Sequence, residues 1–87
     1  MLFKDQTSFT SDPLSFPANG AKFNDLWIGV TGAGPVYVDL LDDEDGVWRT
    51  YPELTFSSTT GQLLTLPRGE VRVRIAAATA TTVKLQW

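Results

Sequence analysis

Two stretches near the end of the chain alternate apolar and polar residues without a break. Glu70 to Ile75 reads Glu-Val-Arg-Val-Arg-Ile, and Thr82 to Trp87 reads Thr-Val-Lys-Leu-Gln-Trp. Because successive side chains of a β-strand point to opposite faces, this alternation predicts two half-buried strands. The residues expected to face the core are Val71, Val73, Ile75, Val83, Leu85 and Trp87. The small, polar spacer Ala76–Thr81 is expected to turn the chain, which would make the two strands a β-hairpin with a basic outer face.

Shorter runs of strand-forming residues lie upstream, separated by Gly, Pro, Asn and Asp. They predict strands over Phe23–Val30, Val36–Asp42, Val47–Tyr51, Leu54–Phe56 and Gln62–Leu66, and an edge strand near Thr7–Thr10. In the first two of these strands, the inward side chains are expected to be Leu26, Ile28, Val30, Val36, Val38 and Leu40. Asp45-Gly46 before an apolar run is a strong hairpin signal. No stretch has the i, i+3, i+4, i+7 spacing of an amphipathic helix.

These elements predict a small all-β fold, an antiparallel β-sandwich or jelly roll of about seven short strands. The chain has 87 residues, which suffice for one modest core, so we expect a single domain over residues 1–87. Residues 1 to about 12 are expected to form an N-terminal arm. Beyond the arm, Leu14, Phe16 and Pro17 form an apolar patch that a turn at Asn19-Gly20 would end.

Composition narrows the chemistry that the chain can carry out. It contains neither cysteine nor histidine, which excludes disulfides and Cys/His zinc sites and removes the commonest general base. The carboxylates of Asp25, Asp39, Glu53 and Glu70 could supply a pair for glycoside hydrolysis, but so small a sandwich has little material for a cleft. The glycine-rich segment 32–35 ends in a proline, which lacks the amide donor that a phosphate loop needs. We therefore expect a non-enzymatic protein without a cofactor or a resident metal.

Charge bears on the partners. The acidic cluster Asp42–Asp45 before Gly46 offers the oxygen ligands that calcium prefers, but it lacks the alternating register of an EF-hand loop. We favour a solvated hairpin tip, which also deters edge-to-edge aggregation. The net charge of −3 disfavours nucleic acid as a partner. We find neither an apolar run long enough for a membrane helix nor a signal peptide, and expect a complete, cytosolically made product with no membrane partner.

Candidate interface residues come from three parts of the chain. They are the apolar arm residues Leu2, Phe3 and Phe9, the outward-facing Trp27, Tyr37 and Leu41, and the basic stripe Arg72, Arg74 and Lys84. A lone arm cannot bury its apolar residues well, whereas a neighbouring molecule could. Trp, Tyr and Arg are the usual energetic anchors of protein interfaces. The basic stripe is either a solvated strand face or a docking site for an acidic patch.

Three segments together resemble a known class of protein. They are Gly34–Leu40 (Gly-Pro-Val-Tyr-Val-Asp-Leu), Asp45–Trp48 (Asp-Gly-Val-Trp) and Leu64–Val73 (Leu-Thr-Leu-Pro-Arg-Gly-Glu-Val-Arg-Val). This rhythm of strand, acidic turn and "Leu-Pro-x-Gly" turn resembles small virion proteins of tailed bacteriophages, over about residues 23–87. The resemblance implies a short β-sandwich or jelly roll of the capsid cement or decoration type, or a tail or fibre module. It implies no catalytic residues.

These observations lead to an expected function. It is that of a virion structural protein, assembled in the host cytoplasm, which stabilises the capsid by bridging coat subunits. Its partners would be the major capsid protein or other virion proteins, and we expect a homo-oligomer, for which the threefold sites of a capsid would suit a trimer. Two alternatives stay open. One is a carbohydrate- or receptor-binding tail or fibre module that presents a row of Trp27, Tyr37 and Tyr51, and the other is a head-tail completion protein.

Overall fold

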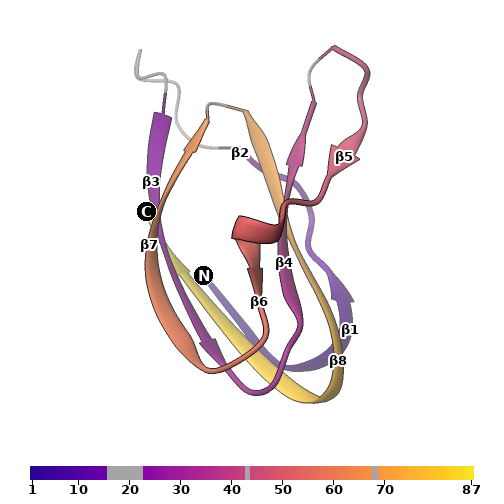
Figure 1. The fold of residues 1–87 in the computed structure, drawn as a ribbon, viewed down its shortest axis with the longest axis vertical. Helices are drawn as coiled ribbons and strands as arrows, with labels where there is room; N and C mark the ends of the chain where they lie inside the picture. Colours follow the sequence, from indigo (N-terminus) through magenta and orange to yellow (C-terminus); the bar gives the residue numbers. More distant parts are fainter. Residues whose placement is uncertain (16–22, 43, 68) are drawn as a thin grey trace.

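The computed structural model describes residues 1–15, 23–42, 44–67 and 69–87, and it is built almost entirely of strands (Figure 1). The strands are β1 (Leu2–Thr10), β2 (Leu14–Ser15), β3 (Phe23–Thr31), β4 (Val36–Leu41), β5 (Trp48–Arg49), β6 (Thr55–Phe56), β7 (Thr60–Pro67) and β8 (Glu70–Gln86). A 3₁₀ turn, η1 (Pro52–Leu54), precedes β6. Every strand pair is antiparallel, so the expected small, antiparallel all-β fold is confirmed. Within these residues no helix has the length and apolar character that a membrane span requires.

Some predicted features lie outside the described residues. They are Phe16, Pro17, the turn at Asn19-Gly20, the acidic Asp43 and Arg68 of the turn before the last strand.

The C-terminal region is one strand of 17 residues, so the predicted hairpin is wrong. Buried side chains recur at every second position in a single phase, from Val71 to Ile75 and again from Thr81 to Leu85. The segment between them, Ala76–Ala80, contains none of the Gly, Pro, Asn or Asp residues that favour turns, and threonine fits a pleated strand. The small side chains there mark the middle of a long strand.

Strand β8 joins two halves of one sheet. Its first part pairs with β4, from Val71↔Leu40 to Ile75↔Val36, and its last part pairs with β3. Strand β3 pairs in turn with β7, while β4 pairs with β5 and β6. Strands β1 and β2 lie along the other side of β8. The two halves curl around a common interior, with β3 and β7 on one side and β4 on the other (Figure 1). A strand that passes from one half-sheet to the next in this way forms the corner of a sandwich-like packing.

The interior between the halves is an apolar core. Its buried residues are Leu26, Ile28, Val30, Val36, Val38, Phe56, Leu64, Leu66, Val71, Val73, Ile75, Val83 and Leu85. Leu40 is half-buried at the margin of this cluster. The alternation therefore predicted most of the core correctly. Trp87 was expected inside, but it is 53% exposed, because it follows Gln86, the last residue of β8, and no longer belongs to the alternating strand.

The N-terminal residues do not project as an arm. Residues 2–10 form β1, which pairs with β8, and the Met1 ammonium donates a hydrogen bond to the Leu85 carbonyl oxygen at 2.8 Å. Only the edge strand predicted near Thr7–Thr10 is confirmed. Phe3 lies opposite Val83, and Phe9 lies opposite Ile75 in the same way, so both rings turn inward and pack against the core. These two rings, expected to lie in an arm that cannot bury them well, are thus partly buried by the chain's own sheet.

The hairpin predicted at Asp45-Gly46 is confirmed. Leu41 lies opposite Trp48, which places β5 beside β4, and Gly46 has a φ of 70° at the tip. That left-handed conformation favours glycine, because it crowds a Cβ atom. The backbone N–H of Asp42 donates to the carbonyl oxygen of Val47 at 2.9 Å and closes the turn.

A pair of leucine variants tests this placement of the core. Leu85 is fully buried on β8, so we expect Leu85→Ala to lower the free energy of unfolding by about 2–5 kcal/mol. Leu63 on β7 is 71% exposed, so Leu63→Ala should change it by less than about 0.5 kcal/mol. Urea unfolding followed by circular dichroism measures both values. Equal losses in the two variants would contradict the assigned faces.

Candidate functional site

A buried carboxylate organises the outer face of β4 and the first part of β8. Asp39 has no exposed surface, and its Oδ2 atom accepts hydrogen bonds from Arg72 Nε at 2.9 Å and Arg74 Nε at 3.0 Å. The hydroxyl of Thr50 donates to Oδ1 at 2.8 Å. Strand register produces this cluster, because Asp39 lies directly opposite Arg72 in the β4–β8 ladder. Two arginines and a threonine thus replace the water that the carboxylate loses on folding.

Aromatic rings cover the same arginines. The guanidinium of Arg72 lies 4.7 Å from the ring centroid of Trp48, and that of Arg74 lies 4.2 Å from that of Tyr37. These are cation–π distances. Two of the three residues of the predicted basic stripe are therefore engaged within the fold. Tyr37, expected in an exposed patch, is half-buried under this arrangement.

The pKa of Asp39 reflects this environment. Burial raises it, but hydrogen bonds from Arg74, Arg72 and Thr50 together lower it more, so the pKa falls below the ordinary value of 3.8. The hydrogen bond to Asp39 raises the pKa of Arg74 in return. Asp39 is therefore ionised at neutral pH and has no proton to donate. Its two oxygens already accept hydrogen bonds from Arg72, Arg74 and Thr50, and these contacts stabilise the fold.

The acidic hairpin tip is also internally paired. Arg49 Nε lies 3.2 Å from Asp42 Oδ2, and Arg49 Nη2 lies 2.6 Å from Asp45 Oδ2. Backbone N–H groups of Glu44 and Val47 donate to the same two carboxylates, at 2.9 Å and 3.0 Å. Among the residues that the structure describes, no group of three or more acidic, His or Cys side chains could hold a metal ion. In the described part of the tip, the carboxylates of Asp42 and Asp45 are thus paired with Arg49 and with backbone N–H groups.

Three predicted interface residues meet on the other half of the sheet. Leu2, Trp27 and Lys84 border a shallow trough of about 390 Å³ on its outer face. Register brings them together, because Lys84 lies opposite both Gly29 and Leu2. The rest of the trough is lined by Gly29, Val30, Thr31, Thr59, Thr60, Gly61 and Thr82. Lys84 is exposed, and it is the member of the predicted basic stripe for which the described contacts include no ion pair.

Trp27 lies down on this face over two glycines. Gly29 and Gly61 are opposite each other in the β3–β7 ladder. A Cβ atom at Gly29 would lie 2.5 Å from Cη2 of Trp27, and one at Gly61 would lie 3.3 Å from its Cζ2. Glycine is therefore needed at position 29 for the indole to approach the backbone closely. The indole packs against the backbone of β3 and β7 and remains partly exposed.

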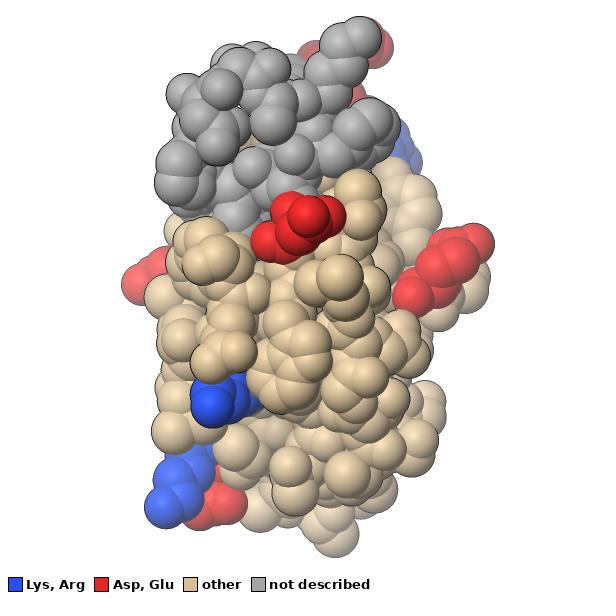
Figure 2. All heavy atoms as spheres, turned by 90° about the vertical axis from the view of Figure 1, so that its left-hand side faces the viewer, with Lys and Arg blue, Asp and Glu red and all other residues tan. Residues whose placement is uncertain are grey.

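Exposed aliphatic residues flank the indole. Leu63 lies directly opposite Trp27 and is 71% exposed, and Leu2 on β1 is 58% exposed. We call the group formed by Leu2, Trp27, Leu63 and Lys84 the Trp27 face. Figure 2 views the molecule from the side of β3 and β7, where a broad area without charged side chains lies between charges at its margins. Exposed apolar surface of this kind on a small protein is typical of an interaction site.

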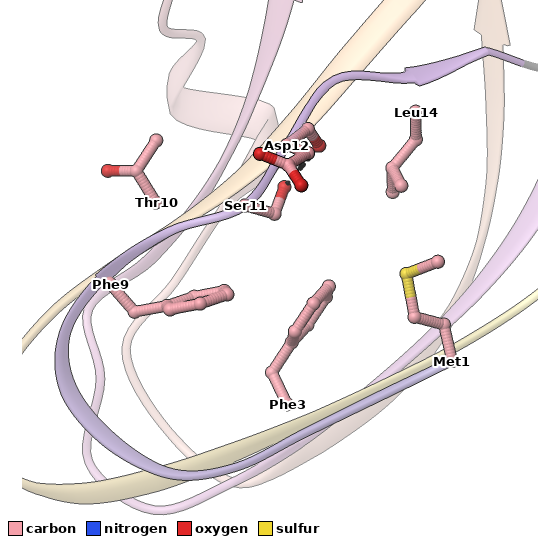
Figure 3. Close-up of a pocket in the computed structure, with 7 residues that line it drawn as sticks. All are labelled: Met1, Phe3, Phe9, Thr10, Ser11, Asp12 and Leu14. Atoms are coloured by element: carbon pink, nitrogen blue, oxygen red, sulfur yellow. Dashed lines mark hydrogen bonds between the residues drawn. The ribbon is translucent and has the colours of Figure 1, made fainter.

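The remaining interface candidates lie elsewhere. Phe3 and Phe9 are in contact, with ring centroids 4.9 Å apart, and they line a hollow of about 230 Å³ (Figure 3). Its other walls are Met1, Thr10, Ser11, Asp12 and Leu14. The Ser11 hydroxyl is occupied, because it accepts from the Val73 N–H and donates to the Asp12 carbonyl oxygen. Leu41 is half-buried opposite Trp48.

Sequence reasoning did not foresee the roles of two residues that shape these surfaces. Asp39 was named only as a candidate carboxylate, and its contact with Thr50 depends on the path of the chain after β5. Leu63 was not singled out, although the Leu63-Leu64 pair carried a signal. If Leu64 and Leu66 both face the core, alternation along the strand places Leu63 on the outer face.

The chain matches no protein-family model, no curated protein and no solved structure. Its role must therefore be inferred from the surfaces described above and from the resemblance in its sequence.

Removal of the buried carboxylate tests the Asp39 cluster. Asp39→Asn should lower the free energy of unfolding at neutral pH by about 1–3 kcal/mol, less than for a fully buried pair because both arginines are partly exposed. The pKa of Asp39 is lowered by folding, so its contribution is complete above the ordinary value of 3.8 and is lost as the pH falls through the lower folded value. Urea unfolding from neutral pH to about pH 2 should show the two proteins converging in acid. The exposed Asp12→Asn variant is the control, and a constant difference across this range would contradict the assignment.

A double-mutant cycle tests the packing of Trp27. Gly29→Ala should lower the free energy of unfolding by about 1–3 kcal/mol, because the new Cβ displaces the indole. In the Trp27→Ala background the same change should cost nothing, since the clash is gone. Gly61→Ala, with a looser contact, should have a smaller effect than Gly29→Ala. A cost at position 29 that does not depend on Trp27 would show that the indole does not lie there.

Proposed function

We propose that this chain is a non-enzymatic virion structural protein that binds coat subunits through the Trp27 face. The observation that carries the proposal is exposed apolar surface on one face of the sheet. Leu2 and Trp27 border the trough, and Leu63 lies opposite Trp27 on the same face. The virion setting comes from the resemblance of residues 23–87 to small proteins of tailed phages. Since Arg72 and Arg74 are engaged with Asp39, the cationic contribution comes from Lys84.

The chemistry of this face suits a protein partner. Leu2 and Leu63 offer aliphatic surface, which gains free energy on burial and forms no directional polar contacts. Trp27 is a typical anchor residue, and its ring already packs closely over the backbone at Gly29 and Gly61, so we expect little side-chain entropy to be lost on binding. Lys84 at the rim favours an acidic patch on the coat protein. In this proposal the Trp27 face takes the place of the expected contacts through the apolar residues of an N-terminal arm and the whole basic stripe.

Binding of this kind would stabilise a capsid by mass action. A protein that binds the assembled coat better than free subunits shifts the equilibrium towards the assembled form. The preference arises if the Trp27 face spans two adjacent coat subunits, because only the assembled lattice then presents the whole complementary surface. The sheet itself needs no rearrangement in this mechanism.

Cosedimentation of the purified chain with expanded capsids of its phage tests this function. We expect binding to capsids and weak or no binding to free coat subunits. Trp27→Ala should weaken capsid binding about tenfold to a hundredfold, as is usual for an anchor residue. Val47→Ala is the matched control, because Val47 is also exposed, at 46%, but lies at the hairpin tip.

Two outcomes would contradict the proposal. One is equal binding to capsids and free subunits, or no binding to either. The other is an equal loss of affinity in the Trp27 and Val47 variants, which would show that the Trp27 face is not the surface in contact.

A second candidate is carbohydrate binding at the same face. A partly exposed indole beside the hydroxyls of Thr31, Thr59 and Thr82 could stack on a sugar ring. The expected row with Tyr37 and Tyr51 is not formed, because Trp27 aligns with Gln86 and Tyr37 aligns with Arg74, at opposite ends of β8. Titration of tryptophan fluorescence with a panel of oligosaccharides would distinguish the two candidates. A saturable change that is lost in Trp27→Ala would favour this one.

A further inference from the structure

Strand β7 has one side without a partner. In the described part of the chain it pairs with β3 alone, over eight regular positions from Phe23↔Pro67 to Val30↔Thr60. Along its other side, no described strand pairs with the backbone N–H and C=O groups of β7. Such an edge is a template for pairing with another strand, and proteins usually protect it with charges, bulges or very short strands.

Strands β1 and β5 carry those protections, whereas β7 has only a proline, Pro67, at its end. Strand β1 contains Lys4 and Asp5, has register shifts, and places Asp5 at a φ of 54°. Strand β5 spans two residues and includes Arg49. Strand β7 is eight residues long and contains no charged residue. The uncharged stretch continues upstream to Leu54, which makes 54–67 the longest stretch of the chain without an Asp, Glu, Lys or Arg.

We propose that two copies of this chain pair antiparallel through β7, about a twofold axis near Leu63. Charge favours this edge, because each copy has a net charge of −3 and two copies repel each other where charged surfaces meet. An antiparallel pair of identical strands is self-complementary, which is what a twofold interface requires. The outward residues of β7 suit this register, since Leu63 stands between Gly61 and Thr65, and Gly61 of one copy would face Thr65 of the other.

This pairing would shield the most exposed of the large hydrophobic residues described. Leu63, which is 71% exposed, would lie beside Leu63 of the second copy. Trp27 lies opposite Leu63 on β3, the strand that already pairs with β7. An apolar row in the order Trp27, Leu63, Leu63, Trp27 would therefore cross the joined sheet. A twofold axis that joins two antiparallel edges into one sheet is perpendicular to that sheet. Both Trp27 faces would therefore lie on the same side of the dimer.

The inference extends the proposed function but does not require it. Two Trp27 faces on one side would let the dimer bind two coat sites at once, which raises avidity without a new contact. The dimer itself rests on the β7 edge alone, and its mass in solution can be measured without a capsid. Failure of capsid binding and failure of dimer formation are thus separate results.

Sedimentation equilibrium over a range of concentrations tests the dimer. The monomer has a mass of 9.6 kDa, and we expect wild-type protein to approach twice that mass as concentration rises. Leu63→Lys places a charge on the edge in each copy, opposite its counterpart, and should leave only monomer. Leu2→Lys is the matched control, because Leu2 is similarly exposed on the same outer face but lies on β1, and it should keep the dimer.

Hydrogen exchange provides a readout that needs no variant. Amides of residues 60–66 should exchange more slowly at the concentrations where the dimer forms, while those of residues 2–10 should not change. A mass of one chain at every concentration would overturn the proposal, as would a trimer. Equal effects of the two lysine variants, or slowed exchange in residues 2–10 instead of 60–66, would overturn it as well.

Discussion

The fold depends on the hydrogen-bonding of β8 along both of its sides. One side receives β4 over the first part of the strand and β3 over the last part, and the other side receives β2 and β1. Because the alternation of β8 keeps one phase over 17 residues, its inward side chains contribute to the core of both halves. A break in this phase would turn the apolar residues of one half towards solvent. The unbroken strand is thus what makes one core out of two half-sheets.

The outer faces of the two halves differ in how far their side chains are paired and covered. On the β4 side, Asp39, Arg72 and Arg74 satisfy one another, and Trp48 and Tyr37 cover the arginines. That face is closed by its own side chains. On the β3 side, glycines and threonines leave a shallow trough, and the apolar groups around it stay exposed. The same sheet therefore supplies a closed, stabilising surface at one end of β8 and an open one at the other, which is why we assign binding to the β3 side.

Period-two alternation was sufficient to predict the fold class and most of the core. It succeeded on β3, β4 and β8, where buried Val, Ile and Leu side chains follow one another at every second position. It did not distinguish a turn from a continuing strand at Ala76–Ala80, because small residues are compatible with both. It also could not show that Met1 and residues 2–10 return to β8, since that pairing joins opposite ends of the chain. Local pattern carries no information about such distant partners.

The candidate site was predictable only in part. Outward positions such as Trp27 and Lys84 follow from alternation, but their meeting with Leu2 depends on the β1–β8 register. The basic stripe was read correctly as outward, yet the carboxylate that neutralises it lies on another strand. The contact of Asp39 with Thr50 depends on the return of the chain through β5, which alternation along a single strand does not show.

The position of β8 in the chain also determines the order in which the fold can form. During synthesis β1 emerges first, and the strand with which it pairs emerges after all the others. Until then the hairpin of β4 and β5 can form, while Phe3 and Phe9 have no sheet to cover them. Contacts between such distant segments make folding slow, since a long loop must close before they can form. Nascent chains of this protein would therefore expose their N-terminal aromatics until β8 has left the ribosome, and a chaperone that binds extended apolar segments would meet them there.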